Sequence, residues 1–162
     1  MNRPVGITTI QVRHNIEVAH RLSKLRGKCE NIHGHSMWVE LEMLAPINEN
    51  GIMGGMEFGD VKKVFRHHLD TELDHRLLLN KDDPWAKKFV DGRYLASAEH
   101  AHSEGQHLPG LQICKDDPTT ENLAKWIGEW ACLEFGEGFG VQKIHVVVHE
   151  TSVNLATWTV TL

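Results

Sequence analysis

Two stretches decide the fold: ITTIQVRHNIEVAH (residues 7–20) and HSMWVELEMLA (residues 35–45). In both, apolar side chains recur at every second position, which is the period of a β-strand with one buried face. The apolar sets are Ile10, Val12, Ile16 and Val18 in the first stretch and Met37, Val39, Leu41 and Met43 in the second. Residues 21–32 carry serine, glycine and many charges, which is typical of a loop. The sequence therefore predicts two strands that can pair as a hairpin.

Helical periodicity appears in two later segments. Residues 58–70 place Val61, Val64, Phe65, His68 and Leu69 on one stripe. Residues 119–135 follow a proline, carry a second apolar stripe, and end before Gly136 and Gly138, which act as stop signals. Two more strands are expected over residues 142–150 and 154–161.

The rest of the chain has weaker signals. LDHRLLLN (residues 73–80) is interpreted as a helix end or a short connector. Residues 81–117 are expected to form an extended irregular connector, with a short helix near Trp85–Val90. The predicted order is β-β-α-(irregular)-α-β-β over a single domain, residues 1–162. This order indicates an α+β fold, a four-stranded antiparallel sheet with two helices on one face.

Composition excludes several classes of function. The chain has 162 residues, a net charge of -5 and a pI near 6.2, which argue against nucleic acid or an anionic membrane as the main partner. No apolar run approaches the roughly 20 residues that span a bilayer, and the N-terminal residues do not resemble a secretory signal. Three widely spaced cysteines fit reduced thiols, so a cytoplasmic protein is expected.

Histidines carry the strongest chemical signal, since 12 are present. His33 and His35 flank Gly34 at the start of a predicted strand, where alternate side chains point to the same face. If the two strands pair, His20 comes to lie beside them. Three imidazoles with an open fourth position are typical of catalytic zinc. The alternative is an ordinary polar surface or a hydrogen-bonded histidine pair.

Two groups in the preceding loop are candidate bases. Cys29 could act as a thiolate towards a substrate held on the metal, and Glu30 beside it is an alternative base. The alternatives are a small apolar residue for Cys29 and a solvated loop carboxylate for Glu30. His100, His102 and His107 are interpreted as loop histidines.

The run AHRLSKLRGKCENIHGHSMWVELEM (residues 19–43) resembles the 6-pyruvoyl-tetrahydropterin synthase / 6-carboxytetrahydropterin synthase family, whose hallmark is Cys-x-x-x-His-Gly-His before a strand. Four further family motifs follow in order: MEFGDVKKVF, with Glu57 where the family has aspartate, then LDHRLLLN, DDPTTENLAKWI and VVVHETSVNLATW. The similarity covers most of residues 10–162, but nothing carries over to residues 81–117.

The resemblance implies roles for individual residues. It implies zinc ligands His20, His33 and His35, a catalytic thiol at Cys29, and a second proton-transfer pair formed by Asp74 and His75. It further implies a pterin pocket made by Glu150, Thr119, Thr120 and Glu121. Without the resemblance, Asp74 and His75 would be interpreted as a helix-end charge pair and Glu150 as a strand-end charge. Thr119, Thr120 and Glu121 would be interpreted as a helix N-cap and first turn.

The resemblance also implies a tunnelling fold, in which subunits join into an oligomeric barrel, expected here as a homo-hexamer of two stacked trimers with active sites at subunit interfaces. The expected reaction is zinc-dependent conversion of 7,8-dihydroneopterin triphosphate to 6-carboxy-5,6,7,8-tetrahydropterin, with release of acetaldehyde and triphosphate, for 7-deazapurine (queuosine) synthesis. The short spacing from Cys29 to His33 resembles this branch.

Two alternatives stay open. Glu30 also makes the motif Glu-x-x-His-Gly-His, which resembles a folate-type subgroup that forms 6-hydroxymethyl-7,8-dihydropterin, so a dual-function enzyme is possible. A non-catalytic pterin- or metal-binding protein is the alternative from another class, although proton-transfer groups would serve no purpose in it.

Overall fold

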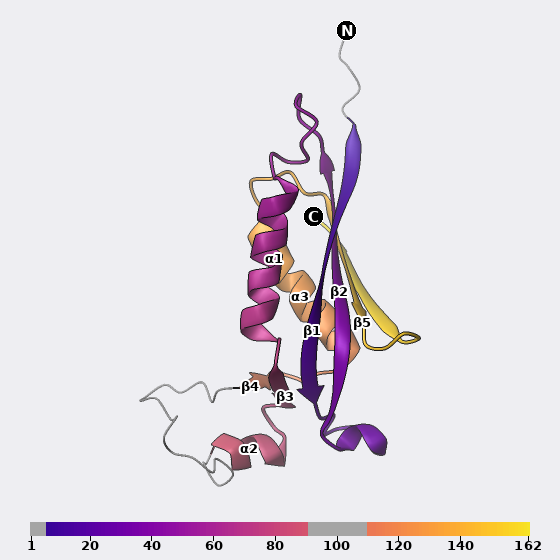
Figure 1. Cartoon of the computed structure of the whole chain (residues 1–162), viewed down its shortest axis with the longest axis vertical. Helices are drawn as coiled ribbons and strands as arrows, with labels where there is room; N and C mark the ends of the chain where they lie inside the picture. Colours follow the sequence, from indigo (N-terminus) through magenta and orange to yellow (C-terminus); the bar gives the residue numbers. More distant parts are fainter. Residues whose placement is uncertain (1–5, 91–109) are drawn as a thin grey trace.

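The computed structural model describes residues 6–90 and 110–162 (Figure 1). Its centre is a six-stranded mixed sheet with the strand order β4-β3-β1-β2-β5-β6. The strands are β1 (Ile7–His20), β2 (His33–Pro46), β3 (Arg76–Asn80), β4 (Leu111–Cys114), β5 (Lys143–His149) and β6 (Leu155–Thr161). The helices are α1 (Phe58–Glu72), α2 (Pro84–Val90) and α3 (Thr120–Phe135). The predicted α+β class is therefore confirmed.

The long β1–β2 hairpin organises the sheet. All fourteen residues of β1 pair with β2 in antiparallel register, from Ile7 opposite Pro46 to His20 opposite His33. Because facing residues in a ladder share one side of the sheet, the register places His20 and His33 together. Alternation then adds His35 to the same face.

The core lies between one sheet face and the helices α1 and α3, which cover the same side in Figure 1. The apolar stripes predicted for the two helices and the two strands supply it, and α1 packs on β1 while α3 packs on β5 and β6. Gly128 of α3 permits a close approach here, because a Cβ at this position would lie 2.0 Å from the Trp158 ring. The opposite face of the sheet, which carries Glu17, Ser36 and Trp38, is covered by neither α1 nor α3.

Two details of the predicted fold are wrong. The antiparallel core of β1, β2, β5 and β6 is extended by β3 and β4, which pair in parallel, so the sheet has six strands instead of four. LDHRLLLN was expected to be a helix end or connector, but Arg76–Asn80 forms β3 against β1. Its consecutive leucines are buried on both sides, so it lacks the alternation that would identify a strand.

The predicted connector over residues 81–117 is only partly irregular. It contains β4, and it contains the short helix α2 at Pro84–Val90 where one was expected. His100, His102 and His107 lie outside the described residues. None of the helices in the described ranges is long and apolar enough to cross a membrane.

Candidate metal centre

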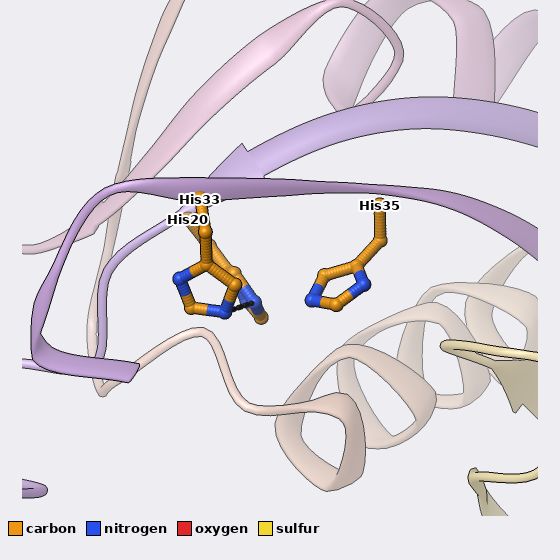
Figure 2. Close-up of side chains that lie close together, drawn as sticks. All are labelled: His20, His33 and His35. Atoms are coloured by element: carbon orange, nitrogen blue, oxygen red, sulfur yellow. Dashed lines mark hydrogen bonds between the residues drawn. The ribbon is translucent and has the colours of Figure 1, made fainter. Parts of the chain in front are cut away.

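Three histidines converge at the end of the hairpin, as the sequence predicted. His20, His33 and His35 each offer a ring nitrogen, and these atoms all lie within 4.8 Å of one another. Figure 2 shows the rings projecting from β1 and β2 towards a common point. The closest pair is His20 Nε2 and His33 Nε2, at 3.1 Å. No other such cluster occurs among the residues that the structure describes.

Backbone carbonyls fix which nitrogen faces that point. His20 Nδ1 lies 2.8 Å from the Pro118 carbonyl oxygen, and His33 Nδ1 lies 2.8 Å from the Asn31 carbonyl oxygen. A carbonyl can only accept, so each Nδ1 carries the hydrogen and each Nε2 of the neutral ring keeps a lone pair. Two lone pairs 3.1 Å apart repel each other, and a cation between them would remove that repulsion.

The third ring, His35, contributes a buried nitrogen with no hydrogen-bond partner. Its Nε2 is shielded from solvent and makes no hydrogen bond to any described residue. Buried polar atoms are almost always paired, because leaving one unpaired costs about 1–3 kcal/mol. A metal ion would satisfy this atom.

The electrostatics also favour a neutral ring at His20. The pKa of His20 is lowered from its ordinary value, mainly because burial penalises the imidazolium and also because His33 and His35 lie close. The hydrogen bond to Pro118 and the charge of Glu150 oppose this shift. A neutral imidazole is the form that binds metal.

These features fit zinc. Zinc accepts three imidazole nitrogens at about 2.0–2.1 Å and keeps a fourth position for substrate. The carbonyls of Pro118 and Asn31 act as the orienting groups that metal-bound histidines usually have. Glu150 is not among the clustered donors, which leaves the fourth position to a ligand.

Glu150 nevertheless borders the centre. Its Oε1 lies 3.9 Å from His35 Nε2 and accepts a 2.8 Å hydrogen bond from the Thr120 hydroxyl. Thr119 is the N-cap of α3, because its Oγ1 accepts from the Asn122 backbone N–H. Glu121 is exposed in the first turn of the helix. The structure thus links Thr120 and Glu150, while Thr119 has the capping role expected without the family context.

Cys29 and Glu30 lie in an exposed 3₁₀ turn, Lys28–Glu30, within the loop between β1 and β2. The Cys29 carbonyl accepts a 2.9 Å bond from the Leu22 backbone N–H, which holds this turn against the end of β1. Glu30 Oε1 lies 3.5 Å from the Arg21 guanidinium. The turn leads through Asn31 directly into His33.

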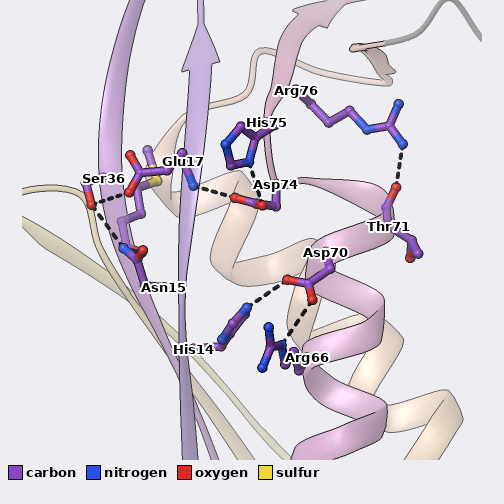
Figure 3. Close-up of polar contacts among 11 residues, drawn as sticks. His14, Asn15, Glu17, Ser36, Arg66, Asp70, Thr71, Asp74, His75 and Arg76 are labelled. Atoms are coloured by element: carbon purple, nitrogen blue, oxygen red, sulfur yellow. Dashed lines mark hydrogen bonds and ion pairs between the residues drawn. The ribbon is translucent and has the colours of Figure 1, made fainter.

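Asp74 and His75 form the predicted pair, with Asp74 Oδ2 2.6 Å from His75 Nδ1 (Figure 3). Asp74 Oδ1 accepts a 2.7 Å bond from the Glu17 backbone N–H, which fixes the carboxylate to β1. The His75 side chain is 78% exposed. It lines a cavity of about 440 Å³ with Glu17 and Ser36, on the sheet face opposite the helices, and His35 also borders this cavity. No described hydrogen bond connects His75 to the three clustered histidines.

Sequence reasoning missed a buried carboxylate, Asp117. It accepts hydrogen bonds from the Ser23 hydroxyl, the Lys24 backbone N–H and the Asn80 side chain. These bonds keep the pKa of Asp117 low against the opposing effect of burial. They also fix the segment that supplies the Pro118 carbonyl to His20. Its sequence signal was only an aspartate before a proline, which is common at helix starts.

Comparison with known proteins agrees with this geometry. The family model described as 6-pyruvoyl tetrahydropterin synthase matches residues 9–160. The chain belongs to this family. Membership confirms the resemblance inferred from the histidine and cysteine motifs.

Curated members of the family include relatives of the carboxy branch. A Pyrococcus horikoshii protein, provisionally named a 6-carboxy-5,6,7,8-tetrahydropterin synthase, is 30% identical over 84% of this chain and 79% of its own length. The 6-carboxy-5,6,7,8-tetrahydropterin synthase of Rickettsia typhi is 26% identical over 69% of this chain and 71% of its own length.

Solved structures show the same family fold. An uncharacterised protein from Wolinella succinogenes superposes with a TM-score of 0.72 at 19% identity, covering 94% of this chain and 97% of that one. A Plasmodium vivax 6-pyruvoyltetrahydropterin synthase, solved with its catalytic glutamate replaced, superposes with a TM-score of 0.69 at 17% identity, covering 97% and 99%.

Proposed function

We propose that this protein is a zinc-dependent lyase that converts 7,8-dihydroneopterin triphosphate to 6-carboxy-5,6,7,8-tetrahydropterin, releasing acetaldehyde and triphosphate. The observation that carries the proposal is the cluster of three imidazoles, of which His20 and His33 have their Nδ1 atoms committed to backbone carbonyls. Family membership supports the pterin substrate, and the names of the curated relatives support the carboxy branch.

His20, His33 and His35 would hold the zinc ion. When bound, it would supply Lewis-acid polarisation of the hydroxyl oxygens on the substrate side chain. The chain's own contribution is rigidity, because carbonyls 2.8 Å away orient two of the rings before any ligand arrives. Such preorganisation avoids reorientation during the reaction.

Two groups would transfer protons. Cys29 lies in the turn that leads into His33 and would act as a thiolate base. His75 would act at a second position, since the carboxylate of Asp74 holds its Nδ1 hydrogen and leaves Nε2 available. The 2.7 Å bond from Glu17 to Asp74 keeps the pair in place.

Glu150 would bind the pterin ring. A carboxylate can accept two parallel hydrogen bonds from the ring N–H and amino group. The Thr120 hydroxyl already occupies Oε1 at 2.8 Å and would orient the carboxylate. Thr119 and Glu121 would line the pocket from the first turn of α3.

Assembly would complete the active site. In one chain the clustered histidines lie on the helix side of the sheet, while His75 lines a cavity on the other face. We propose a homo-hexamer of two stacked trimers, in which active sites lie at subunit interfaces and the His75 pair of one subunit serves a neighbour. The outer edges of β4 and β6 are unpaired in the described sheet and are available for joining subunits.

Folate-type formation of 6-hydroxymethyl-7,8-dihydropterin is the second candidate. The Plasmodium vivax relative has a glutamate as a catalytic residue, and Glu30 stands beside Cys29 here. We further propose that the protein is cytoplasmic. Formation of 6-carboxytetrahydropterin would assign it to queuosine synthesis, whereas formation of 6-hydroxymethyl-7,8-dihydropterin would assign it to folate-type synthesis.

Incubation of the zinc-loaded protein with 7,8-dihydroneopterin triphosphate, followed by mass-spectrometric identification of the pterins, tests the proposal. We expect 6-carboxytetrahydropterin together with an equal amount of acetaldehyde. Substrate binding without turnover would contradict it and would favour a pterin-binding protein.

A further inference from the structure

Arg21 connects three segments near the metal centre. It follows His20 directly, and its side chain is 11% exposed. One guanidinium nitrogen lies 2.5 Å from Asp83 Oδ2, and the other terminal nitrogen lies 3.5 Å from Glu30 Oε1. Arg21 thus joins the end of β1 to the Cys29–Glu30 turn and to the residue before α2.

Asp83 makes this connection rigid. Its side chain is 0% exposed, and its second oxygen accepts a 2.8 Å bond from the Trp85 backbone N–H. A buried carboxylate that lost its cation would be strongly unfavourable, so the guanidinium has little freedom to leave. Arg21 is therefore fixed by Asp83 and presents its remaining nitrogen to Glu30.

Glu30 is the weaker partner of the two carboxylates. Its side chain is 51% exposed and has no other ion pair in the described structure. The planar fork of arginine can reach two carboxylates in one orientation, which a lysine ammonium cannot do in the same way. The pairing draws the Glu30 carboxylate towards Arg21, while Cys29 beside it has no such partner among the described contacts.

We propose that Arg21, fixed by Asp83, is a positioning residue that keeps the Glu30 carboxylate out of the reaction, so that Cys29 is the base and 6-carboxytetrahydropterin is favoured over 6-hydroxymethyl-7,8-dihydropterin. The inference rests on the proposed function and adds a determinant of product choice. Because Glu30 is half-exposed, its ion pair is worth little, and the expected change in product ratio is about two- to fivefold.

The test compares product ratios from 7,8-dihydroneopterin triphosphate in the zinc-loaded protein. Arg21→Lys keeps a cation for Asp83 but loses the fork, so we expect the ratio of hydroxymethylpterin to carboxypterin to rise about two- to fivefold. Adding Glu30→Gln to Arg21→Lys should return the ratio to that of the unmodified protein. Arg66→Lys is the matched control, because Arg66 also pairs with an aspartate, Asp70, but on α1.

The outcomes distinguish a failure of the Arg21 inference from a failure of the proposed enzymatic function. A ratio that stays unchanged in Arg21→Lys overturns the inference alone, including the case in which both products decrease together, as a purely structural role would predict. Absence of any pterin product from the unmodified protein overturns the proposed function and the inference with it.

A second variant keeps the inference testable if Arg21→Lys does not fold. Glu30→Gln alone leaves Arg21 and Asp83 intact, and carboxypterin formation should stay within about twofold, the size of a surface ion-pair effect. A large loss of carboxypterin in this variant would mean that Glu30 already takes part in the reaction, and would overturn the inference.

Discussion

Two imidazole sites in this protein are oriented in the same way but placed differently. His20 and His33 have Nδ1 fixed by backbone carbonyls inside a partly buried cluster, whereas His75 has Nδ1 fixed by a carboxylate and is 78% exposed. A carbonyl orients a ring without adding charge, which suits a metal ligand. A carboxylate also stabilises the protonated ring, which suits proton transfer. The comparison predicts a static metal centre and a separate proton-transfer pair.

The largest effect should come from removing one ring of the three-histidine cluster. His35→Ala should abolish stoichiometric zinc binding and reduce turnover by more than about a thousandfold, because metal polarisation contributes several kcal/mol. Metal analysis of the purified protein and steady-state rates measure both. His149→Ala is the control, since His149 Nε2 is also buried without a hydrogen bond but lies 3.2 Å from Glu40 Oε1, outside the cluster. Full zinc content in His35→Ala would remove that histidine from the ligand set.

A substitution in the exposed Asp74–His75 pair should lower the turnover rate without changing the zinc content. Asp74→Asn keeps an oxygen for the Glu17 N–H but presents an amide to His75, and turnover should fall by about a hundredfold with zinc content unchanged. Asp70→Asn is a close control, because it disrupts another histidine–aspartate contact, His14–Asp70, between β1 and α1 (Figure 3). Equal losses in the two variants would contradict a specific role for the pair.

A substitution that disturbs the orientation of the substrate-binding Glu150 carboxylate should have a smaller effect on the kinetics. Thr120→Val removes the hydroxyl that donates to Glu150, so KM should rise about tenfold with little change in kcat, as expected for a hydrogen bond to a charged group. Thr159→Val removes a hydroxyl 2.6 Å from His145 and serves as the control. A change in kcat without a change in KM would place Thr120 in the chemical step instead.

The smallest effect concerns pH and the metal-free protein. Burial lowers the pKa of His20 and of His68 from 6.5, so near that pH the unfolded chain binds more protons than the folded chain. The free energy of unfolding should therefore decrease as the pH falls from about 7.5 to about 5.5. Urea titrations at several pH values measure this slope. His20→Gln and His68→Gln should each make it shallower, and a slope unaffected by either would contradict the assignment.

Local patterns predicted much of this molecule because its key contacts are local. The β1–β2 hairpin and the two main helices were predicted from periodicity, with boundaries within about two residues. Pairing in the hairpin then determines that His20 faces His33.

Features that depend on long-range contacts were not predicted. The short strands β3 and β4 pair in parallel and are supported by neighbours distant in sequence, so their local signal is weak. The Arg21–Asp83 ion pair and the hydrogen bonds from Ser23 and Lys24 to Asp117 join residues more than fifty positions apart, and no spacing rule reveals them. The candidate-base roles of Cys29 and Glu30 were inferred from their place in the loop before the histidine motif, and the resemblance added to them. The roles of the pocket residues came from the resemblance alone, and all of these roles stay predictions.

His75 has a further consequence for anyone who engineers this protein. It follows the end of α1 with φ at 56°, in the left-handed region where a side chain is strained by about 1–2 kcal/mol. Glycine would relieve that strain, so a search for thermostable variants should repeatedly recover His75→Gly. If His75 has the proposed proton-transfer role, such variants would resist heat better but convert substrate more slowly, because folding alone favours a different residue here.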